Sequence, residues 1–268
     1  MISLTTKDIS KLVQEIRREY GLPESPFRID EVRYDKEGDK LFIIAHDRTD
    51  KSVIIGNSLV IGKLRKRLGV RQVTVYSNLD LEIKRRKLEE AKKLISGTEL
   101  EFLLPIIEAE KKFPPRKWPD VKGDVKTLIF LSFNAKALLG FADRLNLPYE
   151  AVGIRYAFPK LEYEPVEAEP REIFFPNEEK LLRIAKERGT RLVLADFPFG
   201  LKFKDGVVLL NPFRLLHIGF FELKYLFGFE RPVIYDKKAL VDFVVSLTYE
   251  GLMESTDGAN IIWRMWRK

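Results

Sequence analysis

Apolar runs that alternate with helical segments constrain the fold of this chain more than any other feature of its sequence. Residues 127–133, 150–156 and 191–196 have the length and composition of buried strands, and residues 135–145 and 178–187 have the spacing of helices. Strands that are apolar on both faces and are connected by helices form parallel sheets. Residues 126–268 are therefore predicted to form a three-layer α/β/α domain around a parallel sheet.

The preceding residues predict a small α+β domain over residues 1–104. Thr5 and Asp8 are typical of a helix start, and this helix is expected to end before Gly21. Strands are expected at residues 31–34, 40–46, 52–55 and 72–76, with helices at 59–68 and 80–95. Residues 105–125 contain four prolines and are predicted to be a linker, and residues 159–176 are predicted to be a long exposed loop.

The composition excludes several classes of protein. The chain is 45% hydrophobic, which excludes disorder, and it has no cysteine, which excludes a disulfide framework and a thiolate zinc site. Its only imidazoles are those of His46 and His217. No apolar run approaches the roughly 18 residues of a membrane helix, so a soluble cytoplasmic protein without a membrane partner is expected. Two glutamines and 32% charged residues fit a protein from a thermophile.

All of the excess positive charge lies in residues 61–93. The chain has 47 basic and 40 acidic residues, a net charge of +7, and residues 61–93 alone have eleven basic and four acidic residues. A local excess of this kind attracts a phosphate backbone, because each neutralised phosphate releases counterions. Two explanations stay open: nucleic-acid binding, or an exposed helix stabilised by pairs four residues apart, such as Glu82 with Arg86.

Residues 53–70 have the sequence VIIGNSLVIGKLRKRLGV. This sequence resembles the core of a KH domain, in which a Gly-x-x-Gly turn contacts single-stranded nucleic acid. Gly56 matches the first glycine, and Leu59 stands at the second. The resemblance implies a KH-like domain that either binds RNA or serves only as a scaffold. The residues expected to bind RNA are Gly56, Asn57, Lys63, Arg65, Lys66, Arg67, Arg71, Lys84, Arg85, Arg86 and Lys87.

A second resemblance begins at the strand of residues 128–131, which leads into the turn and helix SFNAKALLGFADRL of residues 132–145. This segment is similar to the opening of PP-loop, or adenine nucleotide alpha-hydrolase-like, ATPases, in which the loop Ser-Gly-Gly-x-Asp-Ser holds the phosphates of ATP. Ser132 matches the first serine of that loop. Phe133 and Asn134 stand in place of the two glycines, and Lys136 stands in place of the aspartate.

Two later stretches are similar to archaeal predicted PP-loop ATPases. Asp196 ends an apolar strand, and residues 209–217, LLNPFRLLH, precede a segment with Glu222. The resemblance implies a Rossmann-like domain that binds ATP with magnesium at the carboxyl ends of its strands. The residues expected to bind this cofactor are Ser132, Asn134, Lys136, Asp196, Asn211 and Arg214, with Asp196 as the metal ligand.

The two resemblances together imply a PP-loop-like protein that binds an adenine nucleotide and RNA. Relatives with an RNA-binding domain adenylate a tRNA base, so tRNA is an expected partner, and an ATP pyrophosphatase reaction is expected if the chain is an enzyme. No residue is assigned as catalytic. The alternative is a non-catalytic nucleic-acid-binding or assembly protein that uses the nucleotide fold as a scaffold. Trp263 and Trp266 share one helix face, which leaves core packing, base stacking and a homodimer contact open.

Overall fold

The computed structural model describes residues 4–56 and 58–266, and the chain divides into two compact units. The first unit comprises Met1–Arg86 with Glu108–Trp118, and the second comprises Lys87–Ile107 with Pro119–Lys268. One sheet has three strands and the other has six. The chain is therefore a mixed α/β protein, as its sequence predicts.

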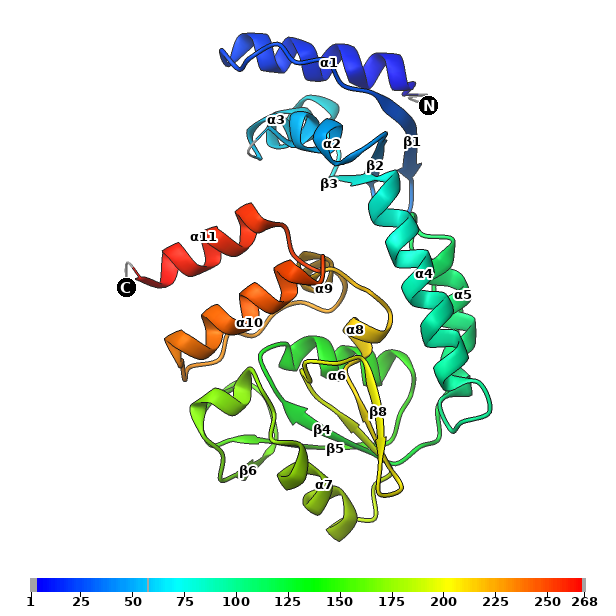
Figure 1. The fold of residues 1–268 in the computed structure, drawn as a ribbon, viewed down its shortest axis with the longest axis vertical. Helices are drawn as coiled ribbons and strands as arrows, with labels where there is room; N and C mark the ends of the chain where they lie inside the picture. Colours follow the sequence, from blue (N-terminus) through cyan, green and yellow to red (C-terminus); the bar gives the residue numbers. More distant parts are fainter. Residues whose placement is uncertain (1–3, 57, 267–268) are drawn as a thin grey trace. The chain divides into compact units, whose positions relative to one another are not determined.

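A three-stranded sheet forms the centre of the first unit (Figure 1). The elements are α1 (Thr6–Glu19), β1 (Ile29–Asp35), β2 (Lys40–Ala45), α2 (Arg48–Ile55), α3 (Leu59–Leu68), β3 (Gln72–Ser77) and the first half of α4 (Asn78–Ile95), which continues into the second unit after Arg86. Strand β2 is central, antiparallel to β1 and parallel to β3. Helix α1 begins with the predicted capping box of Thr5 and Asp8. It buries Ile9, Val13 and Ile16 in a core that also contains residues of β2, α2 and α3.

The predicted strand at residues 52–55 is wrong, because these residues form the second half of α2. Asp47 caps this helix, since its side chain accepts a hydrogen bond from the Asp50 N–H at 2.8 Å. Val53, Ile54 and Ile55 favour a strand by composition. The cap at one end and the left-handed Gly56 at the other nevertheless bound a helix of eight residues, and Ile54 lies in the core.

Residues 105–125, the predicted linker, begin in helix α5 (Leu104–Lys111), which follows the short 3-10 helix η1 (Glu101–Leu103). After α5, the ring of Phe113 packs edge-on against Phe42 and Tyr76, with centroids 5.9 and 5.2 Å away. Glu110 is also buried. Because these side chains are part of its interior, residues 108–118 belong to the first unit.

A six-stranded sheet forms the centre of the second unit, and it is mostly parallel as predicted. The strands are β4 (Thr127–Leu131), β5 (Tyr149–Ile154), β6 (Glu164–Val166), β7 (Leu192–Leu194), β8 (Leu201–Lys204) and β9 (Val207–Leu210). Their order is β6-β5-β4-β7-β9-β8, and only β8 is antiparallel to its neighbour. Every residue of β4, β7 and β9 is buried, which explains why these strands are apolar except for Thr127, whose hydroxyl donates to the Val125 carbonyl oxygen.

Helices cover both faces of this sheet, and α6 and α7 lie on opposite sides of it (Figure 1). The helices are α6 (Ala135–Arg144), α7 (Glu178–Glu187), α8 (Pro212–Leu215), α9 (Phe220–Leu226), α10 (Lys237–Tyr249) and α11 (Ser255–Trp266). Residues 159–176 are not one long loop, because they contain β6 at the edge of the sheet and the 3-10 helix η2 (Pro170–Ile173). None of the helices within the described residues has the length and apolar character needed to cross a membrane.

Candidate functional site

Strand β4 ends at the turn that starts helix α6, next to its parallel partner β7. The buried Ser132 hydroxyl donates to the Phe130 carbonyl oxygen at 3.0 Å and accepts from the Asp196 N–H at 3.1 Å. The Asp196 carboxylate accepts two hydrogen bonds of 2.7 Å from Asn134, one from its backbone N–H and one from its side-chain amide. Asn134 is the residue that begins α6. The carboxylate therefore occupies the helix start, where backbone N–H groups attract an anion.

The environment of Asp196 determines its charge. Burial raises the pKa of this carboxyl group from 3.8 to about 6, although the hydrogen bonds from Asn134 and the charge of Arg214 oppose the rise. At neutral pH the group is therefore mostly ionised. The start of α6 thus holds an anion that is part of the chain itself.

Asn211 and Arg214 lie at the start of the short helix α8 and connect it to neighbouring segments. The Asn211 side chain accepts hydrogen bonds from two backbone N–H groups of α8 and donates to the Phe197 carbonyl oxygen at 2.9 Å. The Arg214 guanidinium pairs with Glu250 and donates to the Ser246 hydroxyl at 3.0 Å. Its Nε is buried without a hydrogen-bond partner among the described residues. Most of the polar groups on these two side chains are therefore engaged within the unit.

Four of the six residues predicted to bind the nucleotide line one small cavity: Asn134, Asp196, Asn211 and Arg214. The sequence thus identified residues that the fold brings together. The cavity has a volume of about 10 Å³, which is the space of roughly one water molecule. All other residues that line it are leucine, isoleucine or phenylalanine. The phosphates of a nucleotide do not fit this space.

Phe133 fills the turn in which the PP-loop ATPases have glycine. Its backbone N–H donates to the Ile173 carbonyl oxygen at 2.9 Å. Its ring is buried against the rings of Phe174, Phe220, Phe229 and Phe243, with centroid distances of 5.2, 5.9, 5.4 and 5.2 Å. A phosphate-binding turn needs free N–H groups and small side chains. The Phe133 N–H and the Asn134 N–H are both engaged within the chain, so this turn does not fit ATP.

The remaining predicted contacts to ATP with magnesium do not meet at this cavity either. Lys136 is exposed, and its stem passes over Gly228, because a Cβ on that glycine would lie 3.2 Å from the Lys136 Cε. Both carboxylate oxygens of Asp196, the predicted magnesium ligand, already accept hydrogen bonds. Within residues 4–56 and 58–266, no group of three or more His, Asp or Glu side chains could hold a metal ion.

Gly56 and Ser58, which lie between α2 and α3, differ from the turn before α6, because Gly56 is half-buried and Ser58 is exposed. Gly56 ends α2 with a φ of +52°, and Ser58 begins α3 with a φ of +67° and makes no side-chain capping hydrogen bond. A Cβ at Gly56 would lie 2.2 Å from the Val60 Cγ2, so both the backbone angle and the packing require glycine. Asn57, which is predicted to contact RNA, lies outside the described residues.

The nine basic residues predicted to bind RNA differ in what they contact. Arg65, Lys66 and Arg71 are exposed, and their side chains have no partner in the part of the chain that the structure describes. Lys84 differs from the prediction, because it is buried and pairs with Glu110 at 2.7 Å. The other five have partners at the surface: Lys63 over the Tyr20 ring, Arg67 with Glu15 and Glu19, Arg85 with the Lys111 carbonyl oxygen, Arg86 with Glu82, and Lys87 with Glu90.

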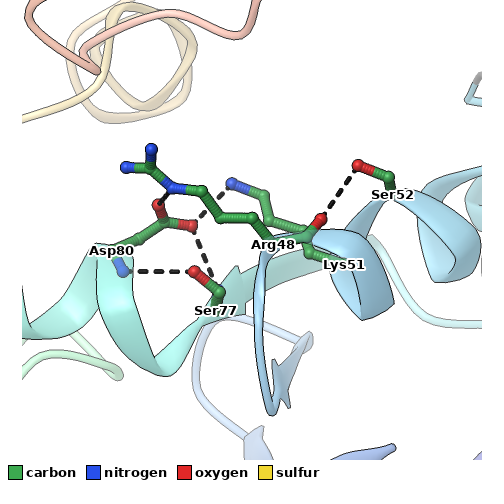
Figure 2. A network of polar contacts seen from close by, with 5 residues as sticks. All are labelled: Arg48, Lys51, Ser52, Ser77 and Asp80. Carbon is green, nitrogen blue, oxygen red and sulfur yellow. Dashed lines mark hydrogen bonds and ion pairs between the residues drawn. The ribbon is translucent and has the colours of Figure 1, made fainter. Parts of the chain in front are cut away.

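A polar network at the start of α4 was not predicted from the sequence (Figure 2). Asp80 accepts hydrogen bonds from Arg48 Nε at 3.0 Å and from Lys51 Nζ at 2.8 Å. Burial would raise the pKa of Asp80, but the Lys51 ammonium and the hydrogen bonds from Ser77 outweigh it and lower the pKa from 3.8 to about 2. The spacing of Ser77 and Asp80 is that of a capping box, so this helix start could have been found in the sequence.

The chain matches no protein-family model, no curated protein and no solved structure in the three comparisons made. Function is therefore inferred from the two helix starts, those of α3 and α6. At α6 the predicted residues contact one another. At α3 the basic residues Arg65, Lys66 and Arg71 remain available to a ligand.

Proposed function

We propose that this chain is a non-catalytic nucleic-acid-binding protein that contacts single-stranded RNA through the turn between α2 and α3. The first unit is then a KH-like module, and the second unit is a Rossmann-like scaffold without nucleotide turnover. One observation carries the proposal: α3 begins at the exposed Ser58 and has free basic side chains in its last turn, whereas α6 begins at a buried carboxylate.

The local geometry of the first unit supports close approach of a nucleic-acid backbone. Two helices meet at the turn after Gly56 and pack with a three-stranded sheet. Gly56 has no side chain to block an approaching ligand, and Ser58 is exposed. A KH domain binds about four nucleotides of backbone at a turn in this position between helices. Leu59, at the place of the second glycine, is 37% exposed and adds an apolar surface beside the turn.

The charge on α3 and just after it supports a polyanionic ligand. Arg65 and Lys66 lie in the last turn of α3, and Arg71 follows three residues after its end. Cations at a helix C-terminus are stabilised by the helix dipole, which explains Arg65 and Lys66 without any ligand. The dipole falls off within the last turn and does not explain Arg71. Phosphate contacts by such side chains give affinity that does not depend on sequence.

The start of α6 supports the absence of nucleotide turnover. A phosphate at this helix start would have to displace the Asp196 carboxylate and the ring of Phe133 from buried positions. The phosphate would accept both hydrogen bonds from Asn134, but the displaced Asp196 carboxylate would lose these two donors at a buried position. The cost of that change opposes ATP binding, and we expect a dissociation constant of about 0.1 mM or weaker.

Binding of a fluorescent single-stranded oligonucleotide of about 16 nucleotides to the full chain tests the proposal. Reversing Arg65, Lys66 and Arg71 to glutamate should weaken binding at least tenfold and should lower the slope of log affinity against log salt by roughly 2. Three exposed lysines elsewhere provide a control with the same change in net charge: Lys7, Lys36 and Lys122. The control variant should retain most of the affinity.

Equal losses in the two triple variants would mean that net charge alone drives binding, and the proposed site would be wrong. Release of pyrophosphate from ATP in the presence of RNA would contradict the non-catalytic assignment. Circular dichroism of both variants establishes that the reversals leave the fold intact, because all six residues are exposed.

A further inference from the structure

Two loops of the second unit each carry an arginine stacked on a tyrosine. Residues 155–160 follow β5, and residues 227–236 precede α10. The Arg155 guanidinium lies 5.9 Å from the centre of the Tyr156 ring, and the Arg231 guanidinium lies 4.8 Å from that of Tyr235. Arg231 Nε also donates to the Tyr235 hydroxyl. The Val233 N–H donates to the Ala157 carbonyl oxygen at 2.9 Å, so the two loops lie side by side.

Tyr156 is held in an unusual position for an aromatic residue. It is 73% exposed, and its φ is +63°, in the left-handed region that bulky side chains rarely adopt. The next two residues, Ala157 and Phe158, are completely buried and fix the loop on the unit. Strained backbone of this kind persists only where the surrounding structure enforces it, and it is common at binding sites. Arg155 lies against the ring, and the high exposure leaves room for a second planar group.

The two loops together carry a small positive charge. Residues 155–160 contain two basic residues and no acidic residue, and residues 227–236 contain one basic and two acidic residues. One of those acids, Asp236, accepts a hydrogen bond from the Ala239 N–H at 2.9 Å and caps α10. Val233, between the two pairs in space, is 62% exposed and adds apolar area. Basic, aromatic and apolar groups thus occur together on this surface.

We propose that these loops, here called the Arg–Tyr surface, bind single-stranded nucleic acid, with one base stacked on Tyr156 and phosphates contacting Arg155 and Arg231. This inference rests on the proposed function and adds a second contact in the other unit. Proteins that bind single strands combine basic side chains with aromatic rings on which bases stack. A base inside a duplex is already stacked on its neighbours and offers no free face, so this surface selects single strands.

Substitution of Tyr156 tests the stacking contact. With the full chain and an oligouridine of about 16 nucleotides, Tyr156→Ala should weaken binding about tenfold, because loss of one stacked base costs that much. Tyr156→Phe should retain wild-type affinity, since the ring remains. Tyr249 is 92% exposed on α10 and provides the matched control, so Tyr249→Ala should have no effect. Arg155→Ala should weaken binding and lower the salt slope by about 0.7.

Photocrosslinking with an oligonucleotide that contains 5-iodouridine locates the contact directly, and we expect the crosslink on Tyr156. Wild-type affinity for Tyr156→Ala with crosslinks confined to residues 52–71 would overturn the Arg–Tyr surface and leave the α3 site standing. Equal weakening by Tyr156→Ala and Tyr156→Phe would also overturn the Arg–Tyr surface, because the ring remains in the second variant. So would tighter binding of the wild-type chain to a duplex than to a single strand. Absence of any binding by the wild-type chain would overturn both this inference and the proposed function.

Discussion

Helices α3 and α6 both begin where the sequence predicts contact with phosphate, but the two helix starts are capped differently. At α6 the chain supplies its own anion, because the Asp196 carboxylate accepts hydrogen bonds from Asn134. At α3, Ser58 has a left-handed backbone and makes no capping hydrogen bond through its side chain. A helix start is therefore a site for an external anion only when no neighbouring strand provides an internal one.

The largest expected effect comes from removing the internal anion. Asp196→Ala should lower the free energy of unfolding by about 3 kcal/mol, because Asn134 loses both of its buried acceptors. Ser58→Ala should change it by less than about 0.5 kcal/mol, since that side chain makes no capping bond. Urea unfolding of the two variants compares the two helix starts directly. Similar losses of unfolding free energy in the two variants would contradict the difference between the starts of α3 and α6.

Two glycines test whether the turn between α2 and α3 has room for a side chain. Gly56 and Gly69 have similar φ values, +52° and +66°, but an added Cβ would lie 2.2 Å from Val60 at Gly56 and would meet nothing within 4 Å at Gly69. Gly69→Ala should cost about 1 kcal/mol from backbone strain alone. Gly56→Ala should cost about 2 kcal/mol more, because Val60 must move. Thermal unfolding of both variants measures the difference, and equal costs would show that the turn near α3 tolerates a side chain.

The smallest expected effect is a dependence of stability on pH that originates at Asp196. Its folded pKa of about 6 lies above the value of 3.8 for an exposed aspartate, so the folded state binds the proton more tightly. The second unit should therefore gain about 1.3 kcal/mol between pH 7 and pH 5 from this group. Asp196→Asn should abolish that gain. Hydrogen exchange of α6 at the two pH values measures it, and stability that falls over this range in the wild type but not in the variant would contradict it.

The first unit should respond to acid in the opposite direction. Burial would raise the pKa of Glu110, but Lys84 and Arg116 lower it from 4.5 to about 2. The pairing of Glu110 therefore stabilises the first unit above about pH 4.5, and that contribution is lost as the pH falls toward 2. The protection factors of β2 and β3, which correct for the slower intrinsic exchange of amides in acid, should thus fall below pH 4.5, a range in which the protonated Asp196 no longer destabilises α6. Uniform loss of protection in both units would contradict this difference.

The sequence predicted the parts of the fold that depend on periodicity. The strands β2, β4 and β5 and the helices α1, α3 and α6 follow from apolar spacing and capping residues. Helix α2 was missed, because a short apolar run such as Val53 to Ile55 fits a strand or a helix equally well. Only the cap at Asp47 distinguishes them.

The sequence predicted most of the residues that meet at the candidate site, but not that they contact one another in place of a ligand. The sequence grouped Ser132, Asn134, Lys136, Asp196, Asn211 and Arg214, and the fold brings four of these six to one cavity: Asn134, Asp196, Asn211 and Arg214. An acid at a strand end looks the same in sequence whether it faces a ligand or a neighbouring helix start. That distinction depends on long-range packing, here the burial of Phe133 among other aromatic rings.

The burial of Lys84 could have been predicted from the sequence. Lys84 shares one face of α4 with Leu81, Leu88 and Ala91, all of which are buried, whereas Lys87 lies on the exposed face. Helical spacing thus separates the structural lysine from the surface lysine. Its partner Glu110 is 26 residues away and could not be identified from spacing.

Hydrogen exchange of the full chain with two ligands tests the central claim most directly, because it reports on both helix starts in one experiment. Saturating single-stranded RNA should slow exchange in residues 55–71, around the start of α3. ATP with magnesium, at about 0.01 mM, a tenth of the strongest dissociation constant expected, should leave exchange in residues 130–138 unchanged. Strong protection of residues 130–138 by the nucleotide, together with no protection of residues 55–71 by RNA, would show that the two helix starts have the opposite roles.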